Sequence, residues 1–511
     1  MIDAAQTFAR HEILLTGGNG FVGKVLLALL LDRYPGFRKL HILVRPKGNL
    51  SAEERFAGDV LASPPLKDIV SRVGESFLRE KIAVWSGDAS LPGCGLDPAV
   101  LEAWQGKLSL ILNCAGLVEF FPPVDESLRA NADTVDNLVV LARHTGARLL
   151  HVSTCYVAGK ADGLVEETEP ISGFYPRRES SVDHSFDHAA EREICRRRVA
   201  QIRETAVVNS EGGQSREIRQ KLTEVGRQRS AQWGWVNTYT YSKSIGEQIL
   251  ASQTEVDYTI VRPAIVESAL RFPFPGWIEG GRTAAPLILM AMGGLKDWPV
   301  RRDIPLEIVP VDLVAGAILA AGALLLNGEH EQVYQLGTAD VNPFELEPLV
   351  RLLEDEARRA RNGDRGLRTP LWLDPLPGLR FLDEAGARAR REKLERRINR
   401  AQGLLSSLQN SGMPGRASLA RRSSALRTLE LQLRFREQTI DQYLPFILEN
   451  RYIFESRNIR RAYERISPQD RERIPWDPQE IDWDAYWRKN QIQGVKRWVQ
   501  PEAVREWTFK I

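Results

Sequence analysis

Residues 237–243 read N-T-Y-T-Y-S-K, which places two tyrosines ahead of one lysine. Tyr239 and Lys243 are four residues apart, so on a helix they share one face, whereas Tyr241 and Lys243 point to different sides. A free tyrosine has a pKa of about 10 and gives up its proton slowly, and a nearby ammonium lowers that pKa. The spacing therefore predicts Tyr239 as a proton donor, Lys243 as the cation that activates it, and Tyr241 as a packing residue.

Two hydroxyl residues end a predicted strand in A-R-L-L-H-V-S-T-C-Y-V. At the carboxyl edge of a sheet, Ser153 or Thr154 could donate to a developing oxyanion, and the frame favours Thr154. Cys155 leaves a second chemistry open, because a cysteine thiolate can accept an acyl group from a thioester. We expect a small buried cysteine instead, since the nearby His151 lies at a different phase of the strand.

The sequence L-L-T-G-G-N-G-F-V-G follows a predicted strand and opens a predicted helix. Glycines in this frame allow a tight turn, a close approach to a pyrophosphate and close packing of helix on strand, while the helix N-terminus offers free amides to the anion. The motif predicts a dinucleotide site. Its expected cofactor contacts are Thr16, Gly17, Asn19, Gly20, Phe21, Val22 and Gly23.

The second predicted strand, L-H-I-L-V-R-P-K, ends in Arg45, where an NAD site would usually place an acidic residue. A guanidinium at this position matches a 2′-phosphate, so we predict NADPH as the cofactor. Asp88, after the third strand, is expected beside the adenine. Asn113 and Ala115, after the fourth strand, are expected beside the ribose.

Short β-branched runs alternate with helical patterns through the first third of the chain. This alternation predicts an α/β fold with a Rossmann-type, doubly wound parallel sheet. A polar, helix-prone segment at about 163–236 interrupts the pattern and is interpreted as a helical insertion. Beyond about Asn342 no further strands are expected. We therefore predict a reductase domain over 1–342 and a mostly helical C-terminal domain over 343–511, with an aromatic tail that packs.

Composition excludes several classes of protein. The 511 residues contain 69 Lys plus Arg against 67 Asp plus Glu, so a net charge of +2 gives no reason to expect a nucleic-acid partner. Four cysteines without metal-binding spacing suit a reducing compartment and predict no metal site. The first residues lack the pattern of a signal peptide, and the longest uncharged stretch, 313–326, is too short to span a bilayer. We expect a cytoplasmic protein in which residues 313–326 form a buried helix.

Together the motifs resemble those of the alcohol-forming fatty acyl-CoA reductases of bacterial type, which belong to the extended short-chain dehydrogenase/reductases. The motifs are T-G-G-N-G-F-V-G, H-V-S-T-C-Y-V, N-T-Y-T-Y-S-K, V-R-P-A-I-V-E-S, P-F-P-G-W-I-E-G and the tail I-D-W-D-A-Y-W. The resemblance covers nearly the whole chain. The first and third motifs occur throughout the superfamily, whereas P-G-W-I-E-G and the tail are more specific.

The resemblance implies NADPH-dependent reduction of a long-chain acyl-CoA to a primary alcohol, through a bound or released aldehyde. It implies that Tyr239 donates the proton, that Lys243 binds the nicotinamide ribose, and that Thr154 or Ser153 steadies the oxyanion. Pro263 and Ile265 would line the nicotinamide. The second residue of N-C-A-G departs from the family pattern and bears on the fit of the cofactor. The insertion between Arg177 and Gln232 and the arginine-rich section after Asn342 also depart from it, and they leave the acyl chain length and the acyl carrier open. The oligomeric state is open as well.

Several alternatives remain at this point. A thioester reductase could stop at the aldehyde, acting on acyl-CoA or on an acyl-carrier protein, and an epimerase would share the fold. A non-catalytic NADP-binding regulator is the third alternative. The arginines at 177, 178 and 196–198 could meet coenzyme A phosphates or simply form solvated helix faces, and an arginine-bearing amphipathic helix could make peripheral contact with a membrane.

Overall fold

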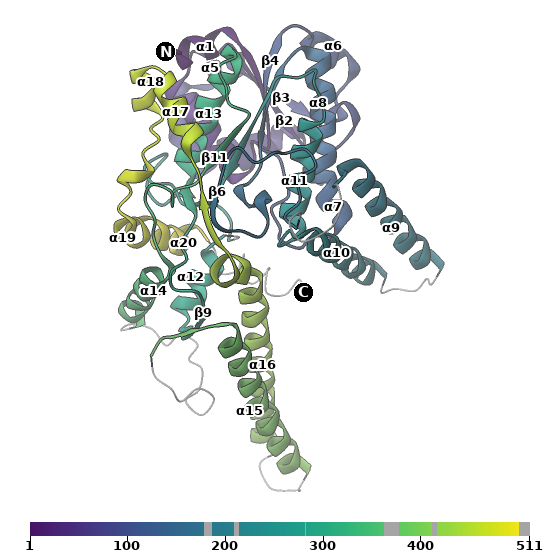
Figure 1. The fold of residues 1–511 in the computed structure, drawn as a ribbon, viewed down its shortest axis with the longest axis vertical. Coiled ribbons are helices and arrows are strands. Elements are labelled where there is room, and N and C mark those ends of the chain that lie inside the picture. The colour runs from purple at the N-terminus through teal and green to yellow at the C-terminus, as the bar shows by residue number, and fades with distance from the viewer. Residues whose placement is uncertain (178–185, 209–213, 282, 362–377, 411–415, 500–511) are drawn as a thin grey trace. The chain divides into compact units, whose positions relative to one another are not determined.

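The computed structural model describes residues 1–177, 186–208, 214–281, 283–361, 378–410 and 416–499. Its central element is a seven-stranded sheet in the order β11-β7-β5-β4-β1-β2-β3, with every pair parallel (Figure 1). The strands are β1 (Glu12–Thr16), β2 (Lys39–Val44), β3 (Ile82–Ser86), β4 (Leu108–Asn113), β5 (Arg148–Val152), β7 (Tyr258–Pro263) and β11 (Val333–Leu336). The predicted doubly wound α/β fold is confirmed.

The strand order reverses direction at β1. From β1 the chain first adds β2 and β3 on one side, and then adds β4, β5, β7 and β11 on the other. In open α/β sheets, ligands bind beyond the carboxyl ends of the strands at such a reversal. The side chains of Thr16, Asn113 and His151 lie at this edge, because Thr16 is in register with Asn113 and Asn113 with His151.

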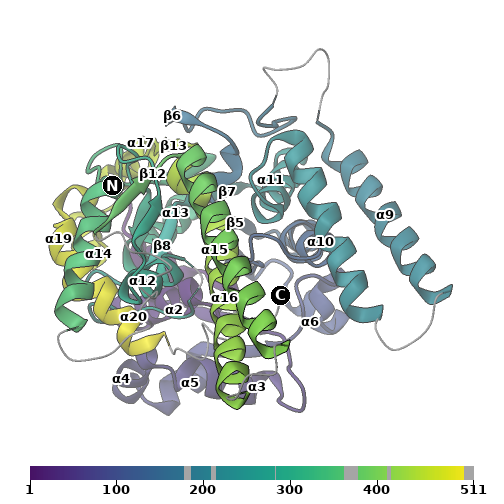
Figure 2. The same cartoon turned by 90° about the horizontal axis from the view of Figure 1, so that it is seen from below.

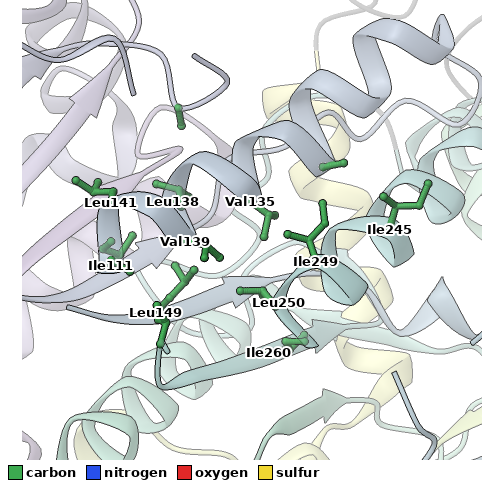
Figure 3. Close-up of a cluster of buried hydrophobic side chains, with 14 of the residues drawn as sticks. Ile111, Val135, Leu138, Val139, Leu141, Leu149, Ile245, Ile249, Leu250 and Ile260 are labelled. Carbon is green, nitrogen blue, oxygen red and sulfur yellow. The ribbon is translucent and has the colours of Figure 1, made fainter. Parts of the chain in front are cut away.

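Helices cover both faces of the sheet. α13 (Val311–Asn327) packs with α1 (Ala4–Arg10) and α2 (Phe21–Arg33), while α6 (Pro98–Trp104), α8 (Thr134–Thr145) and α11 (Thr238–Ala251) pack together on the other face. Figure 3 shows the buried cluster between β4, β5 and β7 and the helices α8 and α11, with Leu138, Val139, Ile249 and Leu250 among its members. Burial of both faces explains the near-continuous apolar strands.

The apolar helix predicted at 313–326 is α13, and its residues 311–326 are buried. Among the helices that the structure describes, none combines the length and apolar character needed to cross a bilayer.

The predicted insertion is helical. It contains β6 (Asp162–Val165), α9 (His188–Val208) and α10 (Gln214–Trp233) (Figure 2). Arg192 on α9 donates to Asp133 Oδ1 at 2.7 Å and also pairs with Asp136 on α8. Ion pairs thus attach this mostly polar pair of helices to Asp133 and Asp136. The composition of the insertion did not predict which residues would form them.

The chain divides into two compact units. The first comprises Met1–Glu279, Glu307–Asn342 and Ile453–Gly494, and the second comprises Gly280–Leu306, Pro343–Tyr452 and Val495–Ile511. The aromatic tail therefore packs with the first unit over 453–494. The remaining elements of the first unit are α3 (Ala52–Phe56), α4 (Pro64–Val73), α5 (Glu75–Lys81), α7 (Val124–Leu128), β8 (Ile265–Glu267), β10 (Ile308–Pro310), α17 (Arg457–Arg465), α18 (Pro468–Arg473) and α19 (Trp483–Ala485).

The second unit is mostly helical. It contains α12 (Ala285–Met292), α14 (Leu346–Arg361), α15 (Glu384–Asn410), α16 (Arg416–Leu444) and the parallel pair β9 (Asp297–Pro299) and β12 (Arg380–Leu382). Two further elements, β13 (Arg451–Phe454) and α20 (Ile492–Trp498), run across the boundary between the units. The expectation of no strands beyond Asn342 is wrong, because β12 and β13 are short pairings without an alternating sequence pattern. The division into domains at 342/343 stays a prediction.

The first residues of the chain lie against a segment near the end of the first unit. The Ile2 N–H donates to the Arg465 carbonyl at 2.7 Å, and the Ser467 N–H donates to the Ile2 carbonyl at 2.8 Å. Asp470 Oδ2 accepts a hydrogen bond from the Ala4 N–H at 2.8 Å. Residues 2–4 are thus held by residues 465–470.

Candidate active site

The glycine loop runs from the end of β1 into α2 and packs tightly against the end of β4. Gly17 has a φ of +72°, and a Cβ there would lie 2.5 Å from the Ala115 nitrogen. A Cβ at Gly23 would lie 2.2 Å from the Gly17 carbonyl oxygen. Neither position can hold a side chain, so the loop packs closely against the end of β4. The first turn of α2, with Phe21, Val22 and Gly23, has N–H groups that find no acceptor within the helix.

A nearby side chain also has unused hydrogen-bonding capacity. Asn19 Nδ2 is buried without a partner among the described residues. An amide in such a position usually meets a ligand or water. The loop therefore fits a dinucleotide, with the pyrophosphate over the first turn of α2 and Asn19 as a donor.

Arg45 follows β2 at an exposed position. Its Nη1 lies 3.5 Å from Asp88 Oδ2, at the end of β3. Partial burial raises the pKa of Asp88, but hydrogen bonds from Ser90 and the charge of Arg45 outweigh it and hold the pKa below its usual value. The structure thus brings Arg45 and Asp88 together beside the outer strands, and the guanidinium remains accessible to an anion.

Thr16, Asn113 and His151 form a hydrogen-bonded chain across three strands. Thr16 Oγ1 donates to Asn113 Oδ1 at 2.7 Å, and the Ala115 N–H donates to the same oxygen at 3.2 Å. Asn113 Nδ2 lies 2.9 Å from His151 Nδ1. Burial, reinforced by Lys243, lowers the pKa of His151 well below its usual value, so the ring is neutral and Nδ1 accepts. The Asn113 side chain therefore supports the floor of the cleft.

Lys243 lies on α11 and is almost fully buried. Its Nζ donates to the Val152 carbonyl at 2.9 Å, and a Cβ added at Gly116 would approach the same Nζ to 2.9 Å. Burial lowers the pKa of Lys243 to about 8, although Cys114 and Glu247 oppose the shift. The ammonium is therefore fixed between the ends of β4 and β5.

Tyr239 lies one turn before Lys243 on the same helix. Asn237 caps this helix by accepting the Thr240 N–H at 2.9 Å, and the Tyr239 N–H donates to the Phe120 carbonyl at 3.3 Å. The Tyr239 side chain is hydrogen-bonded to Thr154. The structure thus brings Tyr239, Thr154 and Lys243 to one region of the sheet edge.

The predicted lowering of the Tyr239 pKa is wrong for the protein alone. Burial raises the pKa of Tyr239, and the hydrogen bond to Thr154 only partly offsets the rise. The sequence showed the four-residue spacing but not the desolvation of the ring. Tyr239 therefore holds its proton at neutral pH.

The two hydroxyls at the end of β5 differ in their partners. Thr154 Oγ1 donates to the Pro263 carbonyl at 3.3 Å and accepts the Tyr156 N–H at 3.3 Å. Ser153 Oγ is buried and has no hydrogen-bond partner within the described part of the chain. Pro263 ends β7, and its carbonyl is the acceptor for Thr154, while Ile265 begins β8. That Pro263 and Ile265 line the nicotinamide stays a prediction.

Cys155 has no means of becoming a nucleophile here. Its Sγ donates to the Arg262 carbonyl at 2.8 Å, and the side chain is inaccessible to solvent. Burial raises the pKa of the Cys155 thiol well above its usual value. The thiolate that covalent catalysis requires is therefore disfavoured, which agrees with the expectation of a small buried cysteine.

Tyr241 is fully buried, as a packing residue should be. Its hydroxyl also donates to Glu191 Oε1 on α9 at 2.5 Å, and Glu191 is paired with Arg229 on α10. Sequence reasoning missed these two charged residues. Glu191 and Arg229 lie in polar segments among many exposed charged residues, so no sequence pattern distinguishes them.

Asn131 is a second residue that sequence reasoning missed. It lies in a π-helical turn, Arg129–Asp133, and its Nδ2 donates to Ser242 Oγ at 2.9 Å and to the Leu117 carbonyl at 3.0 Å. Its Oδ1 accepts the Leu117 N–H at 2.9 Å. Asn131 thereby connects Ser242, the residue before Lys243, to Leu117, which follows β4.

Three of the arginines considered for coenzyme A have partners, either inside the insertion or at Asp133, which precedes α8. Arg177 Nη1 donates to the Gln232 carbonyl at 3.5 Å, Arg196 pairs with Asp133 at 3.4 Å, and Arg197 pairs with Glu193 at 3.1 Å. Arg178 lies outside the described residues. These contacts support the interpretation as helix-face arginines.

The P-F-P-G-W-I-E-G segment, at 273–280, is held by the tail. Gly276 packs against Asn490, because a Cβ added at Gly276 would lie 2.8 Å from the Asn490 carbonyl oxygen. Asn490 Nδ2 also donates to the Leu270 carbonyl at 2.8 Å, just before the segment. Glu279 Oε1 lies 2.5 Å from Lys24 Nζ, on the helix that follows the glycine loop. The most specific motif of the sequence is thus tied to the dinucleotide-binding helix.

The chain resembles known proteins in sequence and in fold. The NAD-binding family described as "Male sterility protein" matches residues 15–318. Fatty acyl-CoA reductase 8 of Arabidopsis thaliana is 30% identical over 69% of this chain and 72% of its own. The probable fatty acyl-CoA reductase 5 of the same plant is 28% identical over 97% and 98% of the two chains. The alcohol-forming fatty acyl-CoA reductase of Simmondsia chinensis is 26% identical over 66% and 69%.

A solved structure shares the fold. The reductase domain of a nonribosomal peptide synthetase from Mycobacterium tuberculosis superposes with a TM-score of 0.51 at 17% identity, over 96% of each chain. The family match, the relatives and the glycine-loop geometry agree. The chain therefore belongs to the fatty acyl-CoA reductase family of the extended short-chain dehydrogenase/reductases, and it is an oxidoreductase that binds a nicotinamide cofactor.

Proposed function

We propose that the protein reduces long-chain fatty acyl-CoA thioesters with NADPH to primary alcohols, and that Tyr239 is the proton donor. One observation carries the proposal: Tyr239 and the buried Lys243 lie one helical turn apart on α11, and Lys243 Nζ donates to the carbonyl of Val152, two residues before Thr154, at 2.9 Å. Exposed Arg45 supports NADPH over NADH, because a guanidinium can pair with the 2′-phosphate.

When bound, the reduced nicotinamide supplies hydride to the thioester carbonyl. Thr154 would then donate a hydrogen bond to the oxyanion, and Tyr239 would transfer its proton to that oxygen to give a hemithioacetal. Lys243 would stabilise the resulting phenolate. The C–S bond would then break, and the proton of the hemithioacetal hydroxyl would pass to sulfur, which gives the coenzyme A thiol and an aldehyde. After the Tyr239 phenolate has regained a proton from water, the aldehyde would accept a second hydride, from a second NADPH, and Tyr239 would donate a second proton to give the alcohol.

Incubation of the purified protein with NADPH and acyl-CoA thioesters of graded chain length tests this function. We expect a primary alcohol, identified by mass, and two NADPH consumed per thioester. One NADPH and an aldehyde would identify the alternative, a thioester reductase that acts on acyl-CoA or on an acyl-carrier protein. No product with any acyl-CoA or acyl-carrier thioester, together with tight NADPH binding, would identify a non-catalytic NADP-binding regulator.

A further inference from the structure

The helical hairpin formed by α15 and α16 carries its arginines in two different ways. Near its base, arginines pair with carboxylates: Arg434 lies 2.7 Å from Glu430, and Arg391 lies 2.5 Å from Asp441. Between Glu395 and Glu430 the sequence contains no aspartate or glutamate. The same stretch contains seven arginines, at 396, 397, 400, 416, 421, 422 and 427. Opposite charges are therefore segregated along one hairpin.

Three of these arginines have no polar partner among the described residues. Arg396, Arg400 and Arg427 are exposed, and within the described ranges none of them makes a hydrogen bond or an ion pair. Arg396 and Arg400 are also four residues apart on α15, where like charges repel and weaken a helix. Their cost to the free protein indicates a role outside it.

Exposed leucines accompany the arginines. Leu404 on α15 is 68% exposed and Leu431 on α16 is 63% exposed, although α15 and α16 lie side by side in both views (Figures 1 and 2). The shared buried core of the hairpin consists of Leu394, Ile398 and Leu433. Arg396, Arg400 and Leu404 follow one another at four-residue spacing along α15, and Arg427 and Leu431 do so along α16. We call these five exposed residues the outer hairpin surface. Arginine interspersed with exposed leucine is typical of helices that lie at a membrane interface.

We propose that the outer hairpin surface binds the anionic headgroups of a lipid bilayer. Guanidinium groups pair with lipid phosphates, and the leucines enter the boundary between headgroups and acyl chains. The net charge of the whole chain is only +2, so the attraction is local to this surface. The choice of lipid over another polyanion rests on the leucines and on the proposed function, since a long-chain alcohol leaves water for a bilayer.

Co-sedimentation of the full-length protein with vesicles tests the proposal. Vesicles of phosphatidylcholine alone are compared with vesicles that contain phosphatidylglycerol, at about 0.1 M salt. Each basic residue near an anionic surface contributes about fivefold to partitioning. We therefore expect the triple variant Arg396→Gln, Arg400→Gln and Arg427→Gln to bind about a hundredfold more weakly than the unaltered protein.

A matched variant controls for net charge. Arg79, Arg197 and Arg358 are exposed, and each is paired with a glutamate one helical turn away. Replacing these three by Gln removes the same charge from other surfaces and should leave vesicle binding within about twofold. A double variant, Leu404→Ser and Leu431→Ser, should weaken the part of the binding that persists at high salt.

The outcomes separate the partners. Equal sedimentation with both kinds of vesicle, or equal binding by the unaltered protein and the triple arginine variant, overturns the proposal. So does a triple variant that loses affinity for an acidic carrier protein or a polynucleotide but keeps its vesicle binding. Reductase activity on short, soluble acyl-CoA without vesicles is measured separately, so failure of the proposed function is distinguishable from failure of lipid binding.

Discussion

The Tyr241 hydroxyl donates a 2.5 Å hydrogen bond to Glu191 Oε1, and this bond joins the helix of the proposed proton donor to the helical insertion. Glu191 also accepts from Arg229 Nε at 2.7 Å, so one buried carboxylate connects α9, α10 and α11. Removing the hydroxyl with Tyr241→Phe leaves the carboxylate one donor short. Hydrogen bonds to charged groups are worth about 1.5–3 kcal/mol, and we expect a loss of this size in the free energy of unfolding, measured in urea.

Tyr258→Phe is the matched control. The Tyr258 hydroxyl accepts from Gln332 Nε2 in an exposed hydrogen bond, so its loss should cost less than about 1 kcal/mol. Equal stability of the Tyr241→Phe variant and the unaltered protein would mean that the insertion is held by its surface ion pairs alone.

Replacing Tyr239 by Phe tests the proton donor. The variant keeps the ring but loses the proton, and general acid catalysis of this kind contributes about 10²–10⁴-fold to rate. We expect kcat/KM for acyl-CoA to fall by about this factor while the Kd for NADPH, from fluorescence titration, stays within about twofold. Full activity in the variant would remove Tyr239 from the mechanism.

The two hydroxyls beyond β5 can be ranked by substitution. Thr154 is hydrogen-bonded to Tyr239, whereas Ser153 Oγ has no partner among the described residues. Because the oxyanion donor must lie beside the proton donor, Thr154→Val should reduce kcat by about 10²-fold, and Ser153→Ala should reduce it by less than about tenfold. Thr154→Ser, which keeps the hydroxyl, should recover most of the rate. The reverse ranking would assign the oxyanion to Ser153.

The pH profile should report Lys243. Burial lowers its pKa to about 8, so the ammonium is present below about pH 8 and is lost above it. Burial raises the pKa of Tyr239, which therefore remains protonated over the same range. We expect kcat/KM for reduction to decline as the pH rises through about 8.

A Lys243→Arg variant supplies the comparison. Its guanidinium stays charged because arginine has a pKa above about 12, and its residual activity should show no descending limb below about pH 10. An identical descending limb in the variant would assign the titration to another group.

Cofactor preference depends on Arg45. Its guanidinium is exposed and lies 3.5 Å from Asp88, and a 2′-phosphate would be a stronger partner than that distant carboxylate. Arg45→Ala should raise the KM for NADPH about tenfold and leave the KM for NADH nearly unchanged. Steady-state measurements with both cofactors decide this, and a parallel rise in both values would show that Arg45 does not read the phosphate.

Short-range patterns accounted for the sheet and for the centre of the site. The apolar runs correctly indicated β1, β2, β3, β4, β5 and β7, and the four-residue spacing placed Tyr239 and Lys243 on one helix. Both are local properties of a strand or a helix. The Rossmann topology then followed from the rules of βαβ connection.

Long-range partners could not be read from the same patterns. Glu191 meets Arg229 and Tyr241 only because the insertion folds back onto α11, and Asn490 reaches Leu270 across 220 positions of sequence. The raised pKa of Tyr239 likewise depends on how completely the surrounding protein excludes water. The periodicity and spacing of residues carry no information on which distant residues meet, or on how fully a side chain is shielded from water.

The pairing of residues 2–4 with residues 465–470 has a consequence for biosynthesis. The Ala4 N–H finds its acceptor, Asp470, only 466 positions later. A nascent chain therefore leaves the ribosome with its first residues unmatched and with the P-F-P-G-W-I-E-G segment lacking the tail that holds it. The first unit therefore completes these contacts only after residues 465–470 have been synthesised.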